Sequence, residues 1–297
     1  MRVAVIDVGS NTARLLVATV DSDGTVAPVA AERNYLRLGA EIARAGTLGK
    51  KKIAATADIC GAYARQAVAL GADHSTVIVT APGRQGASAA ALTAALGTAT
   101  GLPVRVLTAE GEGRLAWDGA VARATGELPE VVAVVDVGGG STEVAVGTPL
   151  LGATWIRSAD LGSLRLTRAY LHDDPPTAPQ IAAAADAVAA ALAGMRPPAP
   201  DVAFAVGGSA RAVAKIVGRR FGAVDLDEAV KILSRRPAAK AARTFGIDAQ
   251  RAETLLAGAL LLAGASRVLG TSLELGRGGL REGAALELAA RETAQAA

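Results

Sequence analysis

The sequence feature that most constrains the fold is a short pattern that occurs twice. It reads VAVIDVGSNT from Val3 to Thr12 and VAVVDVGGGST from Val132 to Thr142. Each copy is an apolar run, then Asp-Val-Gly, then small and hydroxyl residues, which is typical of a strand that ends in a tight turn. The two aspartates, Asp7 and Asp136, lie 129 residues apart, a separation about the size of a small domain. The repeat predicts two similar domains, each presenting its turn toward a shared cleft.

The composition is compatible with two domains and indicates which residue types form their cores. The chain has 297 residues, of which 51% are hydrophobic but only 3% aromatic, so the cores must consist of Ala, Val, Leu and Ile. Charged residues make up 20%, which argues against disorder. The formal net charge of +3 permits a polyanionic ligand without implying a nucleic acid, and we expect none.

Cysteine, histidine and hydropathy exclude several classes of protein. Cys60 is the single cysteine, which rules out an internal disulfide and predicts a buried structural thiol. His74 and His172 have no Cys or His near them in the sequence, which argues against a zinc site or a histidine-based triad. The longest apolar run, Leu255 to Ala265, is too short to span a bilayer. We therefore expect a cytoplasmic protein that does not bind membranes.

Both halves of the sequence begin with three predicted strands and continue with alternating helices and strands. The strands are expected at 2–8, 12–20 and 25–31, and again at 131–137, 142–146 and 151–157. This order predicts an α/β protein with two domains, each a mixed five-stranded sheet flanked by helices. The expected boundaries are 1–124 for domain I and 125–283 for domain II. A last helix over 284–297 is expected to pack back onto domain I.

Three turns with small residues are candidate phosphate-binding loops, because a turn without bulky side chains lets main-chain N–H groups face an anion. Each of the first two turns alone is more typical of an ordinary hairpin turn, and the third alone fits either interpretation, but the repetition of the first two favours function. The candidate residues are Ser10, Asn11 and Thr12 in the first turn, Gly138, Gly139, Gly140, Ser141 and Thr142 in the second, and Gly207, Gly208 and Ser209 in the third.

Four charged residues accompany these turns. Asp7 and Asp136 stand at strand ends, where a carboxylate can hold Mg²⁺ or a water molecule. Glu112 stands in the first turn of a predicted helix, where it either balances the helix dipole or serves as a general base. Arg84 lies on a predicted loop after a buried strand, where it is either an ordinary solvated arginine or a bidentate phosphate ligand.

The ordered motifs resemble one family over almost the whole chain. VIDVGSNT, TAPGR, EGEGRL, VVDVGGGSTE, VGGSARAVA and GLREG follow one another as in the Ppx/GppA phosphatases, which are exopolyphosphatases and pppGpp phosphohydrolases of the actin-like ATPase superfamily. The resemblance implies two actin-like (ribonuclease H-like) domains, an active site in the cleft between them, Mg²⁺ as cofactor and a homodimer. The chain is similar to the short members of the family that have only these two domains.

The resemblance also implies roles for individual residues. Glu112 matches the catalytic glutamate and Arg84 the active-site arginine. Asp136 and Glu143 match an acidic pair that is associated with metal and water, so the expected metal ligands are Asp136, Glu143 and Asp7. The residues of the three turns match the phosphate-binding loops of the family.

Five positions depart from the family pattern. Gly111 replaces a common second glutamate beside Glu112, and Pro82-Gly83 precedes Arg84, which puts the placement of this arginine and the catalytic rate in question. Arg277 replaces an aspartate and Ser209 a threonine.

These observations lead to one main hypothesis and three alternatives. We expect an exopolyphosphatase, a hydrolase of phosphoric anhydrides that releases orthophosphate from the end of inorganic polyphosphate. The alternatives are hydrolysis of pppGpp to ppGpp, as in the stringent response, a regulator that binds nucleotide or phosphate with little catalysis, and an actin-like sugar kinase, which the loops and Glu112 fit less well.

Overall fold

The computed structural model describes residues 1–296 and separates into two compact units. Unit 1 consists of Met1–Arg123 and the segment that begins at Gly278, and unit 2 is Ala124–Arg277. The final helix therefore belongs to unit 1, although the whole of unit 2 precedes it in the sequence. The last residue of the range 284–297 expected for this helix lies outside the described residues.

Unit 1 is built on a mixed five-stranded sheet in the order β3-β2-β1-β4-β5. Strands β1, β2 and β3 are antiparallel neighbours, whereas β4 and β5 extend the sheet in parallel to β1. The elements of this unit are β1 (Arg2–Val8), β2 (Thr12–Val20), β3 (Val26–Tyr35), α1 (Leu38–Ala45), α2 (Lys50–Ala69), β4 (His74–Val79), α3 (Ala81–Arg84), α4 (Ala89–Thr100), β5 (Val104–Val106), α5 (Ala109–Ala122) and α13 (Leu280–Ala296).

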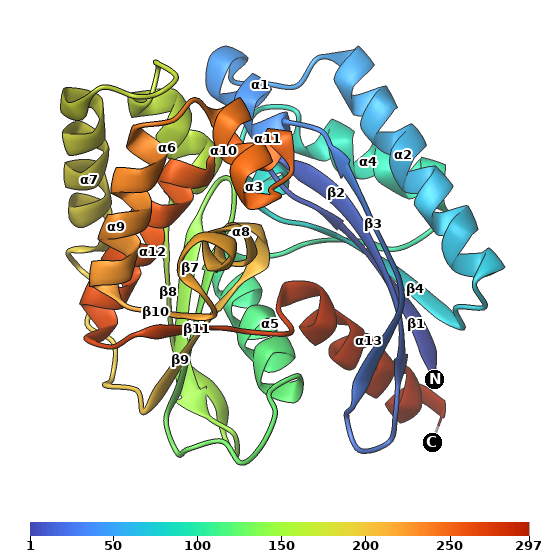
Figure 1. Cartoon of the computed structure of the whole chain (residues 1–297). Coiled ribbons are helices and arrows are strands. Elements are labelled where there is room, and N and C mark those ends of the chain that lie inside the picture. The colour runs from blue at the N-terminus through green and yellow to red at the C-terminus, as the bar shows by residue number, and fades with distance from the viewer. Residues whose placement is uncertain (297) are drawn as a thin grey trace. The chain divides into compact units, whose positions relative to one another are not determined.

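The alternating side chains of β1 and β2 separate two apolar cores in unit 1. On one face Ile6 and Leu15 pack with Cys60 and Leu92 of α2 and α4. On the other face, residues such as Leu16 pack against α5 and α13. Figure 1 shows α2 and α4 over one face of this sheet and α13 over the other. The Cys60 thiol is buried as predicted, and burial together with the charge of Asp7 raises its pKa to about 12.

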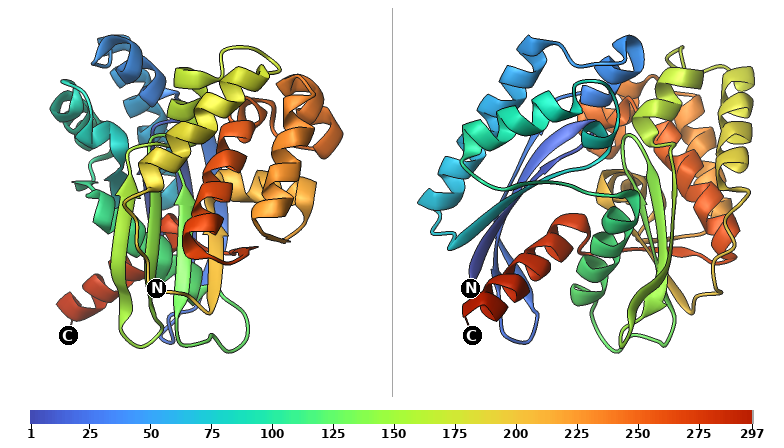
Figure 2. Two further views of the ribbon diagram at one scale, coloured as in Figure 1. Left: turned by 90° about the vertical axis from the view of Figure 1, so that its left-hand side faces the viewer. Right: turned by 180° about the vertical axis from the view of Figure 1, so that it is seen from behind.

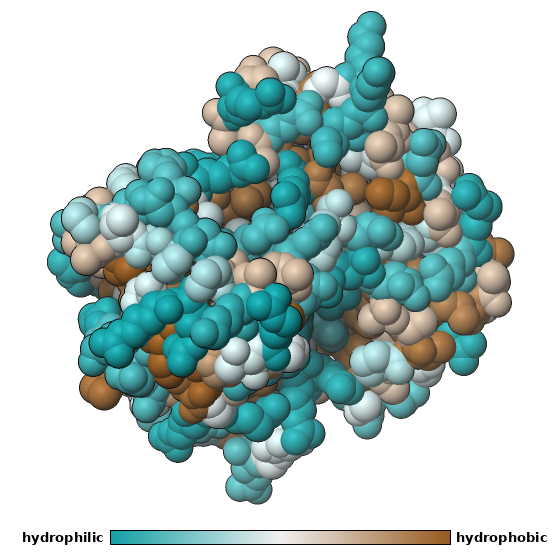
Figure 3. Space-filling model, turned by 45° about the horizontal axis from the view of Figure 1, so that its top comes forward, coloured by the Kyte–Doolittle hydropathy of each residue, from teal (hydrophilic) through white to brown (hydrophobic). Residues whose placement is uncertain are grey.

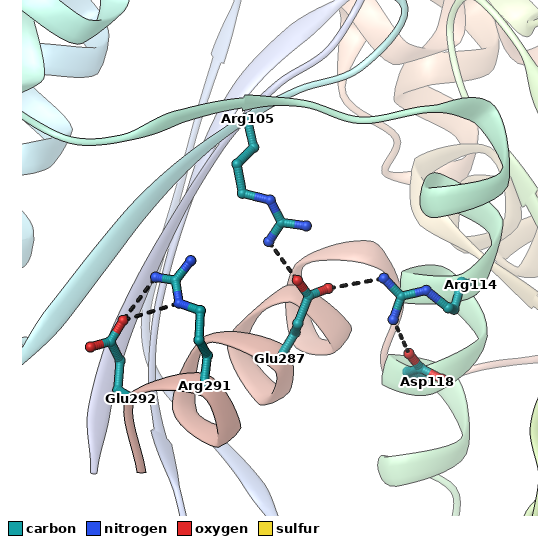
Figure 4. Close-up of polar contacts among 6 residues, drawn as sticks. All are labelled: Arg105, Arg114, Asp118, Glu287, Arg291 and Glu292. Atoms are coloured by element: carbon teal, nitrogen blue, oxygen red, sulfur yellow. Dashed lines mark hydrogen bonds and ion pairs between the residues drawn. The ribbon is translucent and has the colours of Figure 1, made fainter. Parts of the chain in front are cut away.

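Helices α5 and α13 approach each other at glycines. A side chain at Gly119 would collide with the main chain of Gly279, and one at Gly283 with the main chain of Leu115. Ion pairs flank this contact (Figure 4): Glu287 Oε1 lies 2.6 Å from Arg105 Nη1, and Glu287 Oε2 lies 3.2 Å from Arg114 Nη2. The glycines place the two helix backbones in direct contact, the Arg114–Glu287 ion pair joins the two helices, and the Arg105–Glu287 ion pair joins α13 to β5.

Unit 2 repeats the opening of unit 1 and then adds more helices. Its elements are β6 (Val132–Val137), β7 (Thr142–Thr148), β8 (Gly152–Ala159), α6 (Ser163–Tyr170), α7 (Ala178–Leu192), β9 (Val202–Val206), α8 (Gly207–Val217), β10 (Arg220–Phe221), α9 (Ala223–Ser234), α10 (Ala238–Phe245), α11 (Ala249–Ala252), α12 (Leu255–Leu269) and β11 (Leu273–Leu275).

The sheet of unit 2 has six strands in the order β10-β11-β9-β6-β7-β8, and not the five that the sequence predicts. The sixth strand is β10, a two-residue strand that pairs antiparallel with β11. β6, β9 and β11 are parallel to one another. Helix α12 is buried along most of its length in the core of this unit, where it contacts α7, α8 and α9. The α/β class, the mixed sheets and the repeated three-strand opening agree with the prediction.

The surface is mixed in character. The view in Figure 3 shows apolar side chains in separate small patches among hydrophilic ones, and the exposed large apolar residues, such as Val68, Leu150 and Val224, are scattered along the chain. Within residues 1–296, none of the helices combines the length and the apolar character that crossing a membrane requires.

Candidate active site

The two Asp-Val-Gly turns have the same main-chain structure. The Gly9 N–H donates to the Thr12 carbonyl at 2.9 Å, and the Gly138 N–H donates to the Ser141 carbonyl at 3.0 Å. In the described part of the chain, the N–H groups of the next two residues of each turn donate to no acceptor: Ser10 and Asn11 in unit 1, Gly139 and Gly140 in unit 2. Adjacent N–H groups of this kind form a concave site that suits an anion.

The turn of unit 1 is held by the segment that follows β3. The Asn11 carbonyl accepts hydrogen bonds from the N–H groups of Leu36 and Arg37, and the Ser10 carbonyl accepts one from Gly39 at 2.8 Å. A Cβ at Gly39 would lie only 2.9 Å from that of Ser10, so glycine permits this close approach. The side chains of Ser10, Asn11 and Thr12 are buried, and the turn is consequently fixed before any ligand binds.

The turn of unit 2 is held in a similar way by the start of α6. The Gly139 carbonyl accepts hydrogen bonds from the N–H groups of Leu164 and Arg165, and the Ser163 N–H donates to the Gly138 carbonyl at 2.9 Å. A side chain at Gly162 would collide with the main chain, since its Cβ would lie 2.5 Å from the Gly140 nitrogen. At the end of the turn, Thr142 Oγ1 donates to the Leu161 carbonyl at 2.7 Å.

The strand residues next to the two turns differ in charge. In unit 1, Asp7 of β1 lies opposite Arg14 of β2, and Arg14 lies opposite Arg33 of β3. Residues that face each other across neighbouring strands project from the same side of a sheet. Arg33 also stacks on the ring of Tyr35, with 4.9 Å between the guanidinium carbon and the ring centroid.

In unit 2 the corresponding row is acidic. Asp136 of β6 lies opposite Glu143 of β7, and Glu143 lies opposite Ser158 of β8. The Ser158 hydroxyl donates to Glu143 Oε1 at 2.8 Å, and Glu143 is 97% buried, with 3% of its surface exposed. Two carboxylates directly opposite each other repel, so this arrangement favours a bound cation.

The third predicted loop lies beside Asp136. Gly207 has φ +84°, and a Cβ there would lie 2.6 Å from Asp136 Oδ1, so only glycine suits this position. Gly207 and Gly208 begin α8, where the first N–H groups of the helix have no partner within the helix. The Ser209 hydroxyl donates to the Val137 carbonyl at 3.4 Å. The structure thus brings the second and third predicted loops of unit 2 together around Asp136.

A buried arginine lies beside this third loop, and sequence reasoning did not single it out. Arg251 of α11 has 8% of its surface exposed, and a Cβ at Gly208 would lie 2.7 Å from its Nη2. Arg251 begins the stretch RAETLLAGA, which is part of the family resemblance, but it follows Gly208 by more than 40 residues, and the sequence gives no sign that the two lie side by side.

Arg84 and Glu112 are in direct contact in unit 1. Arg84 Nη1 forms an ion pair with Glu112 Oε1 and also donates to the Leu107 carbonyl at 2.6 Å. Glu112 is buried in the first turn of α5, a helix capped by the Thr108 hydroxyl, which accepts the Gly111 N–H at 3.0 Å. The helix start thus orients the carboxylate, and the sequence prediction that Glu112 stands in a first helical turn is confirmed.

The two departures near these residues have structural explanations. Arg84 ends a short helix, α3, where the sequence predicted a loop, and Pro82 stands in its first turn. A Cβ at Gly83 would lie 2.9 Å from a methyl group of Val106, so this glycine lets α3 pack closely on the sheet. A Cβ at Gly111 would lie 3.2 Å from the Thr108 hydroxyl. The unusual residues therefore leave Arg84 in contact with Glu112.

The donor set of unit 2 fits Mg²⁺. Magnesium prefers oxygen ligands and is commonly held by one or two carboxylates together with substrate phosphates, and Asp136 and Glu143 supply two opposed carboxylates beside a turn with open N–H groups. Asp7, the third predicted ligand, belongs to unit 1 and faces Arg14. Among residues 1–296, no group of three or more His, Cys, Asp and Glu side chains gathers to form a metal site by itself.

Comparison with known proteins agrees with the family resemblance. The sequence model of the Ppx/GppA phosphatase family matches residues 16–292. Exopolyphosphatase 1 of Mycobacterium tuberculosis is 30% identical over 303 residues, which cover 95% of this chain and 87% of the relative. Exopolyphosphatase 2 of the same organism is 36% identical over 194 residues, which cover 62% of this chain and 59% of the relative.

Solved structures share the fold. The Ppx/GppA family member of Aquifex aeolicus superimposes with a TM-score of 0.82 at 24% identity, covering 98% of both chains. An exopolyphosphatase from Cytophaga hutchinsonii superimposes with a TM-score of 0.84 at 18% identity, covering 95% of this chain and 96% of the other. The prediction of two actin-like domains is thereby confirmed.

Proposed function

Because the chain belongs to the Ppx/GppA phosphatase family, we propose that it is an exopolyphosphatase, which releases the terminal phosphate of inorganic polyphosphate as orthophosphate. Two relatives that are 30% and 36% identical to it are exopolyphosphatases, which favours polyphosphate as the substrate. The observation that carries the proposal is the pair of opposed carboxylates, Asp136 and Glu143, beside a turn whose N–H groups are open to an anion.

Unit 2 binds phosphate in this proposal. The N–H groups of Gly139 and Gly140 and the start of α8 at Gly207 supply donors to phosphoryl oxygens. Asp136 and Glu143 would hold Mg²⁺, which supplies positive charge that neutralises the phosphoryl oxygens when it is bound. Ser158 orients Glu143 by its hydrogen bond, and the close contact between Gly207 and Asp136 fixes the second carboxylate.

Unit 1 supplies the base and a cation. Glu112 takes the proton of a water molecule, the water oxygen forms a bond to the terminal phosphorus, and the bond from that phosphorus to the bridging oxygen breaks. The shortened polyphosphate leaves with the electron pair of the broken bond. Arg84 Nη1 contacts the Leu107 carbonyl and Glu112. The other N–H groups of Arg84 can therefore bind the transferred phosphoryl group while Nη1 stays on Glu112. Ser10 and Asn11 add further donors.

Phosphate release from long polyphosphate, short polyphosphate and pppGpp, measured with Mg²⁺, tests the proposal. We expect release from polyphosphate, and we expect Glu112→Gln to lower kcat by about 100-fold or more because it removes the base. Glu110→Gln is the matched control, since Glu110 is exposed in the same helical turn and its loss should leave kcat unchanged.

Other outcomes point to the other hypotheses. Release from pppGpp but not from polyphosphate would replace polyphosphate by pppGpp as the substrate. Tight binding of nucleotide or phosphate without release would favour a regulator. If Glu112→Gln and Glu110→Gln behaved alike, the role of Glu112 as a base would be wrong.

A further inference from the structure

A groove in unit 2 lies between α7 and α12, outside the residues assigned to phosphate binding. Its volume is about 440 Å³, within the range of about 300–1,000 Å³ that is common for small-molecule sites. Figure 2 (left) shows the two helices side by side, α7 in yellow and α12 in orange-red. Most of the side chains that line the groove are apolar, and the charged ones are Arg196 and Arg267.

The shape of the groove follows from glycine and alanine. At Gly264 the two helices touch, since a Cβ there would lie 2.6 Å from a methyl group of Val188, and this contact closes the floor. The wall formed by α7 and its C-cap carries Ala185, Ala189 and Ala193, whose short side chains leave the space open. These three alanines span eight residues of helix, or about 12 Å. The result is a narrow apolar slot that suits an extended hydrocarbon chain.

Both arginines lie at one end of this slot. Helix α7 leads into β9 and α12 leads into β11, and these two strands are parallel neighbours. The C-terminal ends of both helices therefore lie at the edge of the sheet where the strands begin, and Arg196 and Arg267 stand at those ends. The turns with Asp136 and Gly207 lie at the opposite edge, where β6 and β9 end.

The charge at this end is not fully balanced. Arg267 forms an ion pair with Asp227 at 2.6 Å. Arg196 donates from Nη1 to the carbonyls of Ala193 and Met195, and within the described residues it forms no ion pair with a carboxylate. Its remaining N–H groups are suited to bind an anionic head group in a bidentate manner.

We propose that this groove binds a single-chain anionic amphiphile, a medium-chain fatty acid, with its carboxylate on Arg196 and its chain in the apolar slot. Burial of the chain supplies the affinity and the arginine supplies the preference for an anion. The ligand binds at the end of unit 2 that is remote from the candidate phosphate loops, so the groove is separate from the site of hydrolysis.

Calorimetric titration of the protein with decanoate and with decanol, below their aggregation concentrations, tests the hydrocarbon chain and the head group of the ligand separately. We expect one decanoate per chain. Ala189→Phe fills the slot and should weaken binding by roughly tenfold or more, whereas Ala190→Phe, at the next exposed position outside the lining, should leave it unchanged. Arg196→Gln should weaken decanoate binding but not decanol binding, and Arg235→Gln, at an exposed arginine elsewhere, should change neither.

Three results would overturn the proposal. One is the absence of saturable binding by wild-type protein. Another is equal affinity for decanoate in the Ala189→Phe and Ala190→Phe variants when thermal unfolding shows that both are folded. The third is a dimer in sedimentation experiments that Ala189→Phe dissociates, because the groove would then be covered by a second copy of the chain.

Discussion

The two Asp-Val-Gly turns share one backbone but carry opposite chemistry. In both, a glycine N–H closes the turn and the following segment binds the turn carbonyls. In unit 1, however, the strand row beside the turn is Asp7, Arg14 and Arg33, whereas in unit 2 it is Asp136, Glu143 and Ser158. The carboxylate of unit 1 already faces cations, and those of unit 2 face each other. The difference shows how a duplicated scaffold can divide its work: the acidic copy is suited to hold a cation, and the basic copy to meet anionic oxygens.

Removal of one carboxylate from each turn gives the largest expected difference. Asp136→Asn should lower kcat by about 100-fold or more, because loss of a proposed metal ligand would remove stabilisation worth several kcal/mol. We expect Mg²⁺ to raise the Tm of the wild type, and Asp136→Asn should abolish that rise. Asp7→Asn should retain most of that rise. Equal loss of the Mg²⁺ effect in both variants would contradict the division of roles.

Glycines that hold the turns give the next largest effect. Gly162→Ala should lower the free energy of unfolding by about 1–3 kcal/mol and also reduce activity, since its Cβ would meet the main chain of the glycine turn. Gly39→Ala should lower the free energy of unfolding by less, because the atom nearest to its Cβ belongs to the Ser10 side chain and not to the main chain. Gly194→Ala, with nothing within 4 Å of its Cβ, is the control for denaturant unfolding. A larger loss of stability for Gly39→Ala than for Gly162→Ala would mean that the turn of unit 1, and not that of unit 2, is the more tightly held.

Charge changes in the strand rows should have smaller effects on stability. Without Mg²⁺, Glu143→Gln should raise the free energy of unfolding by about 0.2–1 kcal/mol, because it removes the repulsion from Asp136 while an amide oxygen can still accept from Ser158. Arg14→Glu should lower it by a similar amount, because it places a carboxylate opposite Asp7. A lower free energy of unfolding for Glu143→Gln, or a higher one for Arg14→Glu, in denaturant unfolding would show that the two rows do not differ as their charges indicate.

The smallest effect is expected at an acidic pair that arginine already bridges. Asp118 and Glu287 both contact Arg114, and burial, followed by the charge of Glu287, raises the pKa of Asp118 although Arg114 lowers it. A raised pKa in the folded state means that the folded protein binds the proton more tightly, so stability falls as pH rises from the unfolded pKa of about 3.9 through the folded value.

Asp118→Asn removes the carboxylate whose ionisation lowers the stability. The variant should be more stable than wild type at neutral pH by less than about 1 kcal/mol, the gain should vanish below the unfolded pKa, and phosphate release should not change. Thermal unfolding as a function of pH measures this. A loss of activity would mean that Asp118 has a role in phosphate release, although its pairing with Arg114 indicates a structural role.

The sequence allowed much of the fold to be predicted because the decisive signals were local. Strand-turn-strand patterns around Asp7 and Asp136 are visible as apolar runs that end in small residues, and their repetition set the domain number. Two of the elements that were missed have weak local signals: α3 contains Pro82-Gly83, which is typical of a loop, and β10 has two residues that only their pairing with β11 makes a strand.

The site could be predicted only where the residue stands inside a motif. Glu112, Arg84 and the glycine turns were predicted in this way, and the contact between Arg84 and Glu112 agrees with a shared role. The opposition of Asp7 and Arg14 depends on strand register, and the approach of Arg251 to Gly208 on tertiary packing. Neither property is written in a local pattern, since Arg14 is one polar residue within an apolar strand.

The place of α13 in the chain has a consequence for synthesis. The face of the first sheet that carries Val3, Val5 and Leu16 is covered by Ala284, Ala285 and Leu288. These three residues emerge from the ribosome only after the whole of unit 2, Ala124–Arg277, has followed the first segment of unit 1, which is a delay of about 150 residues. At typical rates of about 5–20 residues per second, that face waits for roughly 8–30 s without its cover. Unit 2 has all of its sequence available first, so nascent chains should expose an apolar sheet in the earlier-made unit while the later-made one is already able to fold.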